Sequence, residues 1–135
     1  MHKKILVVVF RRLEDQYQVL ALQMKPDRNQ AWGHVTGNVE KDEKSRVAAT
    51  RELFEETGIR ADLQKLNWTQ QFQDRWNRQV KEKAYLAITN NENIILDENE
   101  HQAYRWISLS DVNSNTFSYA SHFQVFLHAL QELDP

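Results

Sequence analysis

The stretch "RELFEETGI" at residues 51–59 constrains this chain more than any other, because it places Glu52, Glu55 and Glu56 within five positions. In a helix, residues three and four positions apart lie on one face, so these carboxylates converge. Like charges at this spacing destabilise a helix by about 0.2–0.5 kcal/mol for each pair. A solvent-exposed face would more often intersperse lysines. We therefore expect a cation in front of this stripe.

Two helices are predicted from the spacing of the apolar residues. The pattern is helical from Asp42 to Thr57, with Asp42 as the N-cap and Gly58 at the position of a C-cap glycine. A terminal amphipathic helix is predicted from the helical spacing of Phe123, Phe126, Leu127 and Leu130.

The other apolar segments predict strands. The run at residues 4–10 is apolar and β-branched, which is typical of a buried strand. Further strands are expected at residues 17–24, 61–73, 79–89, 94–96 and 103–109, with a short extended piece within 31–37. The fold class is therefore α/β or α+β: a mixed β-sheet sandwiched between α-helices in three layers.

Length, charge and cysteine content narrow the functional class. The chain has 135 residues, a formal net charge of -2 and no cysteine. We expect one compact domain over residues 1–135, without disulfides, thiolate metal sites or cysteine nucleophiles. The near-neutral charge gives no reason to expect nucleic acid as a partner. The apolar run in "KKILVVVF" is too short for a signal peptide, and no segment predicts a membrane span, so a cytoplasmic location is expected.

The residues around the glutamates form a longer motif, "GNVEKDEKSRVAATRELFEETGI", at residues 37–59. Its fixed positions are Gly37, Glu43, Arg51, Glu52, Glu55, Glu56 and Gly58, with aliphatic residues at 53 and 59. This motif resembles the Nudix box, and every defining position is filled. Such a match arises by chance on the order of once in a billion windows. One free position departs from many members, which carry glycine where this chain has Asp42.

The resemblance implies a hydrolase that uses Mg²⁺ (or Mn²⁺) to cleave a nucleoside diphosphate linked to another moiety. Hard divalent cations prefer carboxylate oxygens, neutralise phosphate charge and activate water. The expected metal-binding residues are Glu52, Glu55, Glu56 and Glu100, with Gly37 allowing a close approach of the backbone. The expected catalytic residues are Glu55 and Glu100, with Arg51 and Glu43 orienting the ligands as an ion pair.

Glu100 is a candidate site residue because of a second resemblance. The segment "EH.AY.W" at residues 100–106 is found in several nucleotide-hydrolysing relatives, where the equivalent glutamate serves as a metal ligand or general base. Glu98 is the alternative, two residues away. The five histidines show no metal-ligand spacing, so we expect them at the surface or in the core, with His34 and His101 near the pocket.

The substrate is less strongly indicated. "WGHVTGNVE" resembles the "W..VTG.VE" of bacterial dihydroneopterin triphosphate or deoxynucleoside triphosphate pyrophosphatases. Trp32 is a candidate for stacking on a base or pterin and Thr36 for bonding a phosphate oxygen, although both also suit structural roles. Diadenosine tetraphosphate hydrolases commonly have lysine in the Thr36 position. The pterin type has two arginines where this chain has Met24 and Lys25, and Lys25 remains a candidate phosphate contact.

These observations predict a pyrophosphohydrolase that cuts a nucleoside triphosphate-like substrate to a monophosphate and pyrophosphate. The alternatives are an asymmetric dinucleoside tetraphosphate hydrolase and a catalytically silent nucleotide-binding domain. The expected partner is a small nucleotide or pterin triphosphate, without nucleic acid or membrane, and the protein is expected to be a monomer or homodimer. The basic segment "FQDRWNRQVKEK" is predicted to form an exposed hairpin near the phosphates.

Overall fold

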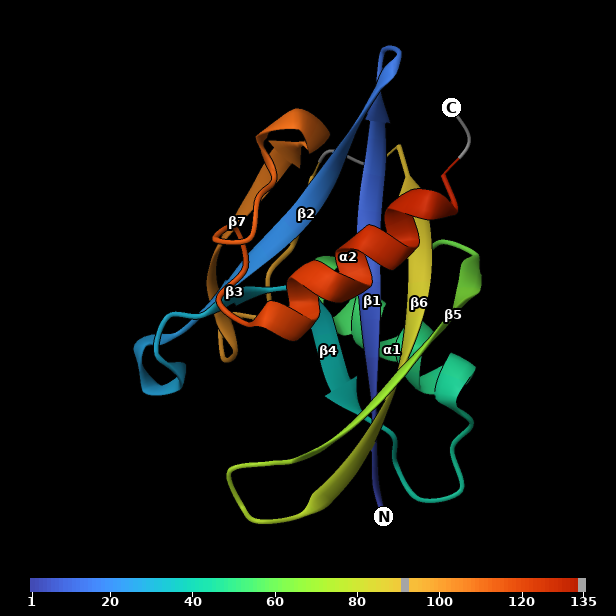
Figure 1. Cartoon of the computed structure of the whole chain (residues 1–135), viewed down its shortest axis with the longest axis vertical. Helices are drawn as coiled ribbons and strands as arrows, with labels where there is room; N and C mark the ends of the chain where they lie inside the picture. The colour runs from blue at the N-terminus through green and yellow to red at the C-terminus, as the bar shows by residue number, and fades with distance from the viewer. Residues whose placement is uncertain (91–92, 134–135) are drawn as a thin grey trace.

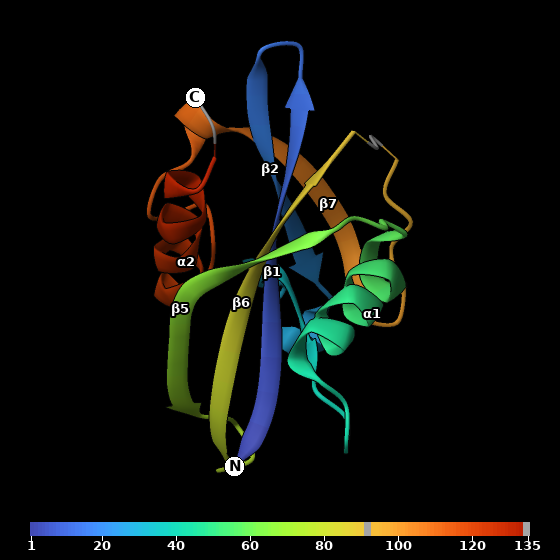
Figure 2. The ribbon, with the colours of Figure 1, turned by 90° about the vertical axis from the view of Figure 1, so that its right-hand side faces the viewer.

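Residues 1–90 and 93–133, which the computed structural model describes, form a seven-stranded mixed sheet between two helices (Figure 1). The strands are β1 (His2–Leu13), β2 (Gln16–Met24), β3 (Trp32–Gly33), β4 (Val35–Asn38), β5 (Leu63–Gln73), β6 (Gln79–Thr89) and β7 (His101–Ser108). The helices are α1 (Ser45–Thr57) and α2 (Ala120–Gln131), with 3-10 turns at Pro26–Arg28 and Leu109–Asp111. Figure 2 shows α1 and α2 on opposite faces of the sheet. The predicted three-layer arrangement is confirmed.

Strand β1 is the centre of the sheet. It pairs in parallel with β6, while its other edge pairs with β4 near its start and with β2 near its end. Its residues alternate between the two cores, with Leu6, Val8 and Phe10 on the side of α2 and Ile5, Val7 and Val9 on the side of α1. Burial on both faces explains why this strand is continuously apolar in sequence.

The predicted start of the first helix is wrong. Helix α1 begins at Ser45 with Lys44 as its N-cap, and Asp42 has a φ of 65°. The preceding turn is closed by the Glu43 amide, which donates to the Glu40 carbonyl at 3.0 Å. The turn therefore requires a left-handed residue at 42, which accounts for the glycine that many chains with this motif carry there. The predicted C-cap is confirmed, since Gly58 has a φ of 77°.

The strand predicted at residues 94–96 is also wrong. The Ile95 amide donates to the carbonyl of Thr57 at 2.9 Å, and the Ile95 side chain lies against Gly58. Ile94 and Leu96 pack on the core beneath α1. These apolar residues cover the C-terminal end of α1 instead of joining the sheet.

A pair of buried histidines joins α2 to the segment that leads into the motif. The His34 amide donates to His122 Nδ1 at 3.1 Å, and His34 Nε2 donates to the His122 carbonyl at 2.9 Å. Gly33 makes this approach possible, because a Cβ there would lie 2.7 Å from His122 Nδ1. Burial lowers the pKa of His34 to about 4 and lowers the pKa of His122 well below its usual value. Both rings are therefore neutral at pH 7.

None of the helices within residues 1–90 and 93–133 is long and apolar enough to cross a membrane.

The histidine pair predicts acid sensitivity. His34 takes up a proton near pH 6.5 in the unfolded chain but only near pH 4 in the folded one. Its neutral form therefore stabilises the fold above pH 6.5, and this contribution falls by about 3 kcal/mol as the pH drops through that window. We expect the difference in unfolding free energy between the wild type and His34→Gln to shrink by about 2–3 kcal/mol between pH 7.5 and 4.5. Urea denaturation measures it, with the exposed His128→Gln as control, and an unchanged difference would contradict the assignment.

Candidate active site

The three clustered glutamates of α1 have very different surroundings. Glu56 is 1% exposed, whereas the side chains of Glu52 and Glu55 are 15% and 50% exposed. Glu52 lies against Gly37 of β4, where a Cβ would clash with its Cγ and Cδ. The glycine of the motif is therefore needed for Glu52 to lie against the strand. The closer approach of its backbone to a metal or phosphate stays a prediction.

Arg51 holds several of these carboxylates at once. Its Nε and Nη2 donate to the two oxygens of Glu43, each at 3.0 Å, so the predicted ion pair is confirmed. Its Nη1 donates to Glu52 at 2.8 Å and to Glu55 at 3.2 Å. Nη2 also donates to the carbonyl of Asn38 in β4 at 3.0 Å. The Arg51 hydrogen bonds lower the pKa of Glu43 to about 2, aided by the amide of Glu40.

Glu56 is the exception. Within the described part of the chain, its Oε2 is a buried atom without a hydrogen-bond partner. Burial raises the pKa of Glu56 well above its usual value, and the hydrogen bond and charge of Glu52 and the charge of Glu100 act in the same direction. A buried carboxylate is costly unless a cation or a proton compensates its charge. Glu56 therefore marks the place where a bound cation would be most stabilising.

The turn before β7 brings a further carboxylate to this place. Glu56, Glu100 and His101 each offer one ligand atom, and these atoms lie within 4.8 Å of one another. Desolvation of its carboxyl raises the pKa of Glu100, followed by the charges of Glu52 and Asp97. Glu98 instead contributes its backbone, whose carbonyl accepts a bond from Lys25 Nζ at 2.9 Å. Of the two loop candidates, the structure places Glu100 beside the glutamates of α1.

The sequence analysis expected His101 near the pocket but did not identify it as a possible metal ligand. The residue is 3% exposed, and its Nδ1 lies 3.8 Å from Glu56 Oε1. A single histidine without a spaced partner is not a metal signal in sequence. Its position directly after Glu100 was the available clue.

Two substrate candidates lie away from α1. Thr36 pairs with Leu6, whose side chain belongs to the core on the side of α2. Neighbouring strand residues face opposite sides, so Thr36 faces away from the side on which Gly37 contacts Glu52. Trp32 is half-buried against the same α2-side core, with the Arg105 guanidinium 5.8 Å from its ring centroid.

Lys25 lies closer to the carboxylates. Its amide donates to the Glu100 carbonyl at 3.3 Å, in addition to its side-chain bond to Glu98. Lys25 thus stabilises the turn that carries Glu100 through two hydrogen bonds to its backbone. Contacts of Lys25, Trp32 and Thr36 with a substrate stay predictions.

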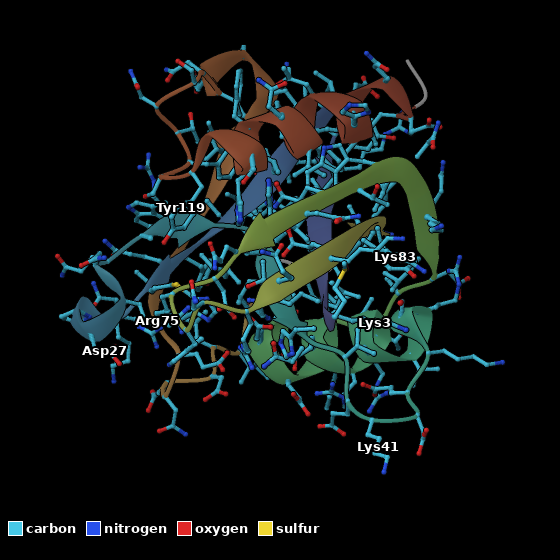
Figure 3. All side chains as sticks on the ribbon, turned by 60° about the horizontal axis from the view of Figure 1, so that its bottom comes forward. Lys3, Asp27, Lys41, Arg75, Lys83 and Tyr119 are labelled. Atoms are coloured by element: carbon cyan, nitrogen blue, oxygen red, sulfur yellow. The ribbon has the colours of Figure 1, made fainter. Side chains whose placement is uncertain are left out.

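The predicted exposed hairpin is formed by β5 and β6. Trp76 at its tip is 59% exposed, and the guanidinium groups of Arg75 and Arg78 lie 4.2 and 5.1 Å from its ring centroid. Figure 3 shows Arg75 of the hairpin and Asp27 of the turn after β2 on the same side of the molecule, with Lys41 at its lower edge. The hairpin tip therefore presents a cationic aromatic surface.

The burial of Glu56 predicts that Glu56→Gln stabilises the fold without metal and loses this advantage over the wild type when metal is bound. Its raised folded pKa means that ionisation destabilises the fold as the pH rises above the usual carboxyl range. At pH 8 with chelator, Glu56→Gln should therefore raise the melting temperature by about 2–6 °C. With Mn²⁺ the wild type should gain stability and Glu56→Gln should gain less. Thermal denaturation measures both effects, with Glu98→Gln as control. A variant that is less stable in chelator would show that Glu56 is compensated within the protein.

The comparisons with known proteins agree with this geometry. The NUDIX domain family model matches residues 2–128. The solved structure of a Caenorhabditis elegans Ap4A hydrolase in a binary complex is 27% identical, covers 94% of this chain and 98% of that chain, and has a TM-score of 0.75. The Escherichia coli dihydroneopterin triphosphate pyrophosphohydrolase is 25% identical, covers 97% of this chain and 93% of that chain, and has a TM-score of 0.78.

A curated relative shows that such a region also occurs in longer proteins. An octanoyltransferase of Myxococcus xanthus is 26% identical over 110 residues, which is 79% of this chain. The chain spans 31% of the length of that protein. With the family model matching nearly the whole chain, the protein belongs to the NUDIX domain family, as residues 37–59 predicted.

Proposed function

We propose that the protein hydrolyses a deoxynucleoside triphosphate or dihydroneopterin triphosphate to a monophosphate and pyrophosphate, with Mg²⁺ (or Mn²⁺) as cofactor. The observation that carries this proposal is the buried carboxyl of Glu56, with Glu52 and Glu100 beside it. This set of hard oxygen ligands suits a divalent cation. The 25% identity to the dihydroneopterin triphosphate enzyme supports the substrate class.

The glutamates have two proposed roles, cation binding and proton transfer. When bound, the cation neutralises phosphate charge and makes a water molecule more acidic. Glu52, Glu56 and Glu100 would hold it, with Gly37 giving Glu52 the space it occupies. Glu100 or Glu55 accepts the proton of the attacking water.

Arg51 and Glu43 are proposed to orient the glutamates of α1. The guanidinium fixes the orientation of Glu52 and Glu55 through charged hydrogen bonds, and Glu43 in turn fixes the guanidinium from two sides. Because Arg51 also bonds the carbonyl of Asn38, the ligand-bearing helix is held against β4.

The substrate contacts follow from the placement of the other candidates. Lys25, beside the turn of Glu100, is proposed to contact the phosphates as a point charge. Trp32 and Thr36 lie on the side of α2, so they would contact the part of the substrate that extends past the edge of β4. Trp32 would stack on the base or pterin there, and Thr36 would bond the phosphate nearest to it.

A second candidate function is hydrolysis of asymmetric dinucleoside tetraphosphates. The 27% identity to the C. elegans Ap4A hydrolase, over nearly the full length of both chains, favours it. A catalytically silent nucleotide-binding domain is disfavoured, because binding alone would not require every glutamate of the motif. We also propose that the chain acts as one domain, monomeric or homodimeric, in the cytoplasm. The net charge of -2 supports a small-molecule partner over nucleic acid.

The products separate the two candidates. We expect wild-type protein with Mg²⁺ to give higher kcat/KM for deoxynucleoside or dihydroneopterin triphosphates than for diadenosine tetraphosphate, with pyrophosphate as a product. Glu100→Gln should lower kcat more than it raises KM, because the carboxylate acts in the transition state. Glu98→Gln is the matched control, with the same charge change two residues away in the same turn. Preference for diadenosine tetraphosphate would favour the second candidate, and equal turnover in both variants would remove Glu100 from the site.

The Arg51 contacts predict a geometric effect. Arg51→Lys keeps the positive charge but cannot bond Glu43 from two nitrogens while bonding Glu52. We expect kcat to fall by about 10–100-fold, the usual size of such supporting interactions. Steady-state kinetics measures this, with Arg60→Lys, in the segment after α1, as control. Wild-type turnover in Arg51→Lys would show that charge alone is sufficient.

A further inference from the structure

His101 is buried, although one of its ring nitrogens has no hydrogen-bond partner among the described residues. The side chain is 3% exposed at the start of β7, and among residues 1–90 and 93–133 its Nδ1 has no hydrogen-bond partner. Buried polar atoms are nearly always hydrogen-bonded in folded proteins. The backbone there is fixed, because the His101 amide donates to the Asp97 carbonyl at 2.9 Å. The ring nitrogen therefore faces Glu56 from a rigid position.

A hydrogen bond to Glu56 would be the simplest reason for burying the Nδ1 of His101, but the geometry does not allow one. The distance of 3.8 Å between His101 Nδ1 and Glu56 Oε1 is too long for one. Glu56 Oε2, the other oxygen of the same carboxyl, also lacks a partner within the described residues, so this pair of side chains leaves two buried polar atoms unsatisfied. A single ion between them would satisfy both.

The spacing of the group fits such an ion. The ligand atoms of Glu56, Glu100 and His101 lie within 4.8 Å of one another. Two ligands on opposite sides of a first-row metal ion, each at about 2.1 Å, lie about 4.2 Å apart. A small movement of the exposed Glu100 side chain would close the site.

We propose that His101 supplies a nitrogen ligand to a metal position that it forms with Glu56 and Glu100, and that this position favours a transition ion such as Mn²⁺ or Co²⁺ over Mg²⁺. Imidazole nitrogen binds transition ions, whereas Mg²⁺ prefers oxygen ligands and keeps much of its water. This inference rests on the proposed function, in that Glu56 and Glu100 are taken as metal ligands. It changes which ion the enzyme selects.

Electron spin echo spectroscopy of Mn²⁺ bound to the full chain tests the nitrogen directly. We expect ¹⁴N modulation from an imidazole ligand in the wild type and in the control variant His128→Asn, and its loss in His101→Asn. Absence of the coupling in the wild type, or its persistence in His101→Asn, would overturn the proposal. Thermal denaturation checks folding of the variant, and His101→Gln provides a second replacement. If both variants fail to fold, the wild-type spectrum alone decides.

Calorimetric titration tests the selectivity. The ratio of the Kd for Mg²⁺ to the Kd for Mn²⁺ should fall at least tenfold in His101→Asn, and an unchanged ratio would overturn the preference. These readouts are distinct from the proposed function. Mn²⁺ binding without ¹⁴N coupling, in an enzyme that still hydrolyses triphosphates, removes His101 alone. Coupling in a protein that hydrolyses none of the candidate substrates removes the proposed function and leaves the ligand assignment.

Discussion

The arrangement of the site depends on the guanidinium of Arg51. This one cation bonds Glu43, in the turn before α1, and also Glu52 and Glu55, which otherwise would repel each other along one side of the helix. It also bonds the carbonyl of Asn38, so the charge cluster is attached to β4 as well as to α1. Part of the cation expected in front of the glutamates is therefore built into the motif itself.

Arg51 leaves one carboxyl uncompensated. Among the described residues, Arg51 donates no hydrogen bond to Glu56, whose side chain lies on the buried face of α1. The difference has a functional consequence. Arg51 orients the glutamates that are less buried than Glu56, whereas on the proposed function the charge of Glu56 would be compensated by the bound cation. On the proposed function, Arg51 would keep the metal-binding glutamates in position without itself occupying the place of the metal.

The sequence predicted the local and periodic features and missed those that depend on loops. The C-cap at Gly58 and the strand at 79–89 follow from short-range rules, and the Arg51–Glu43 pair follows from the resemblance to the Nudix box; the structure has all three. Asp42 looked like an N-cap, but the turn before α1 needs a left-handed residue there. Residues 94–96 looked like a strand because apolar residues covering a helix end have the same composition. The placement of His101 beside Glu56 depends on how β7 enters the sheet, and its position directly after Glu100 is a weak local indication of it.

On the proposed function, the alternation of β4 limits how a substrate could be held. Gly37 faces α1 and makes room for Glu52, so its neighbour Thr36 must face α2. A molecule that reaches both must pass the edge of this short strand. The anhydride and the rest of the substrate would then meet different layers of the sandwich, with carboxylates on one side and Trp32 on the other. Changes in the α2 layer could alter the recognised group while leaving the hydrolytic carboxylates in place, because β4 separates the two sets of contacts.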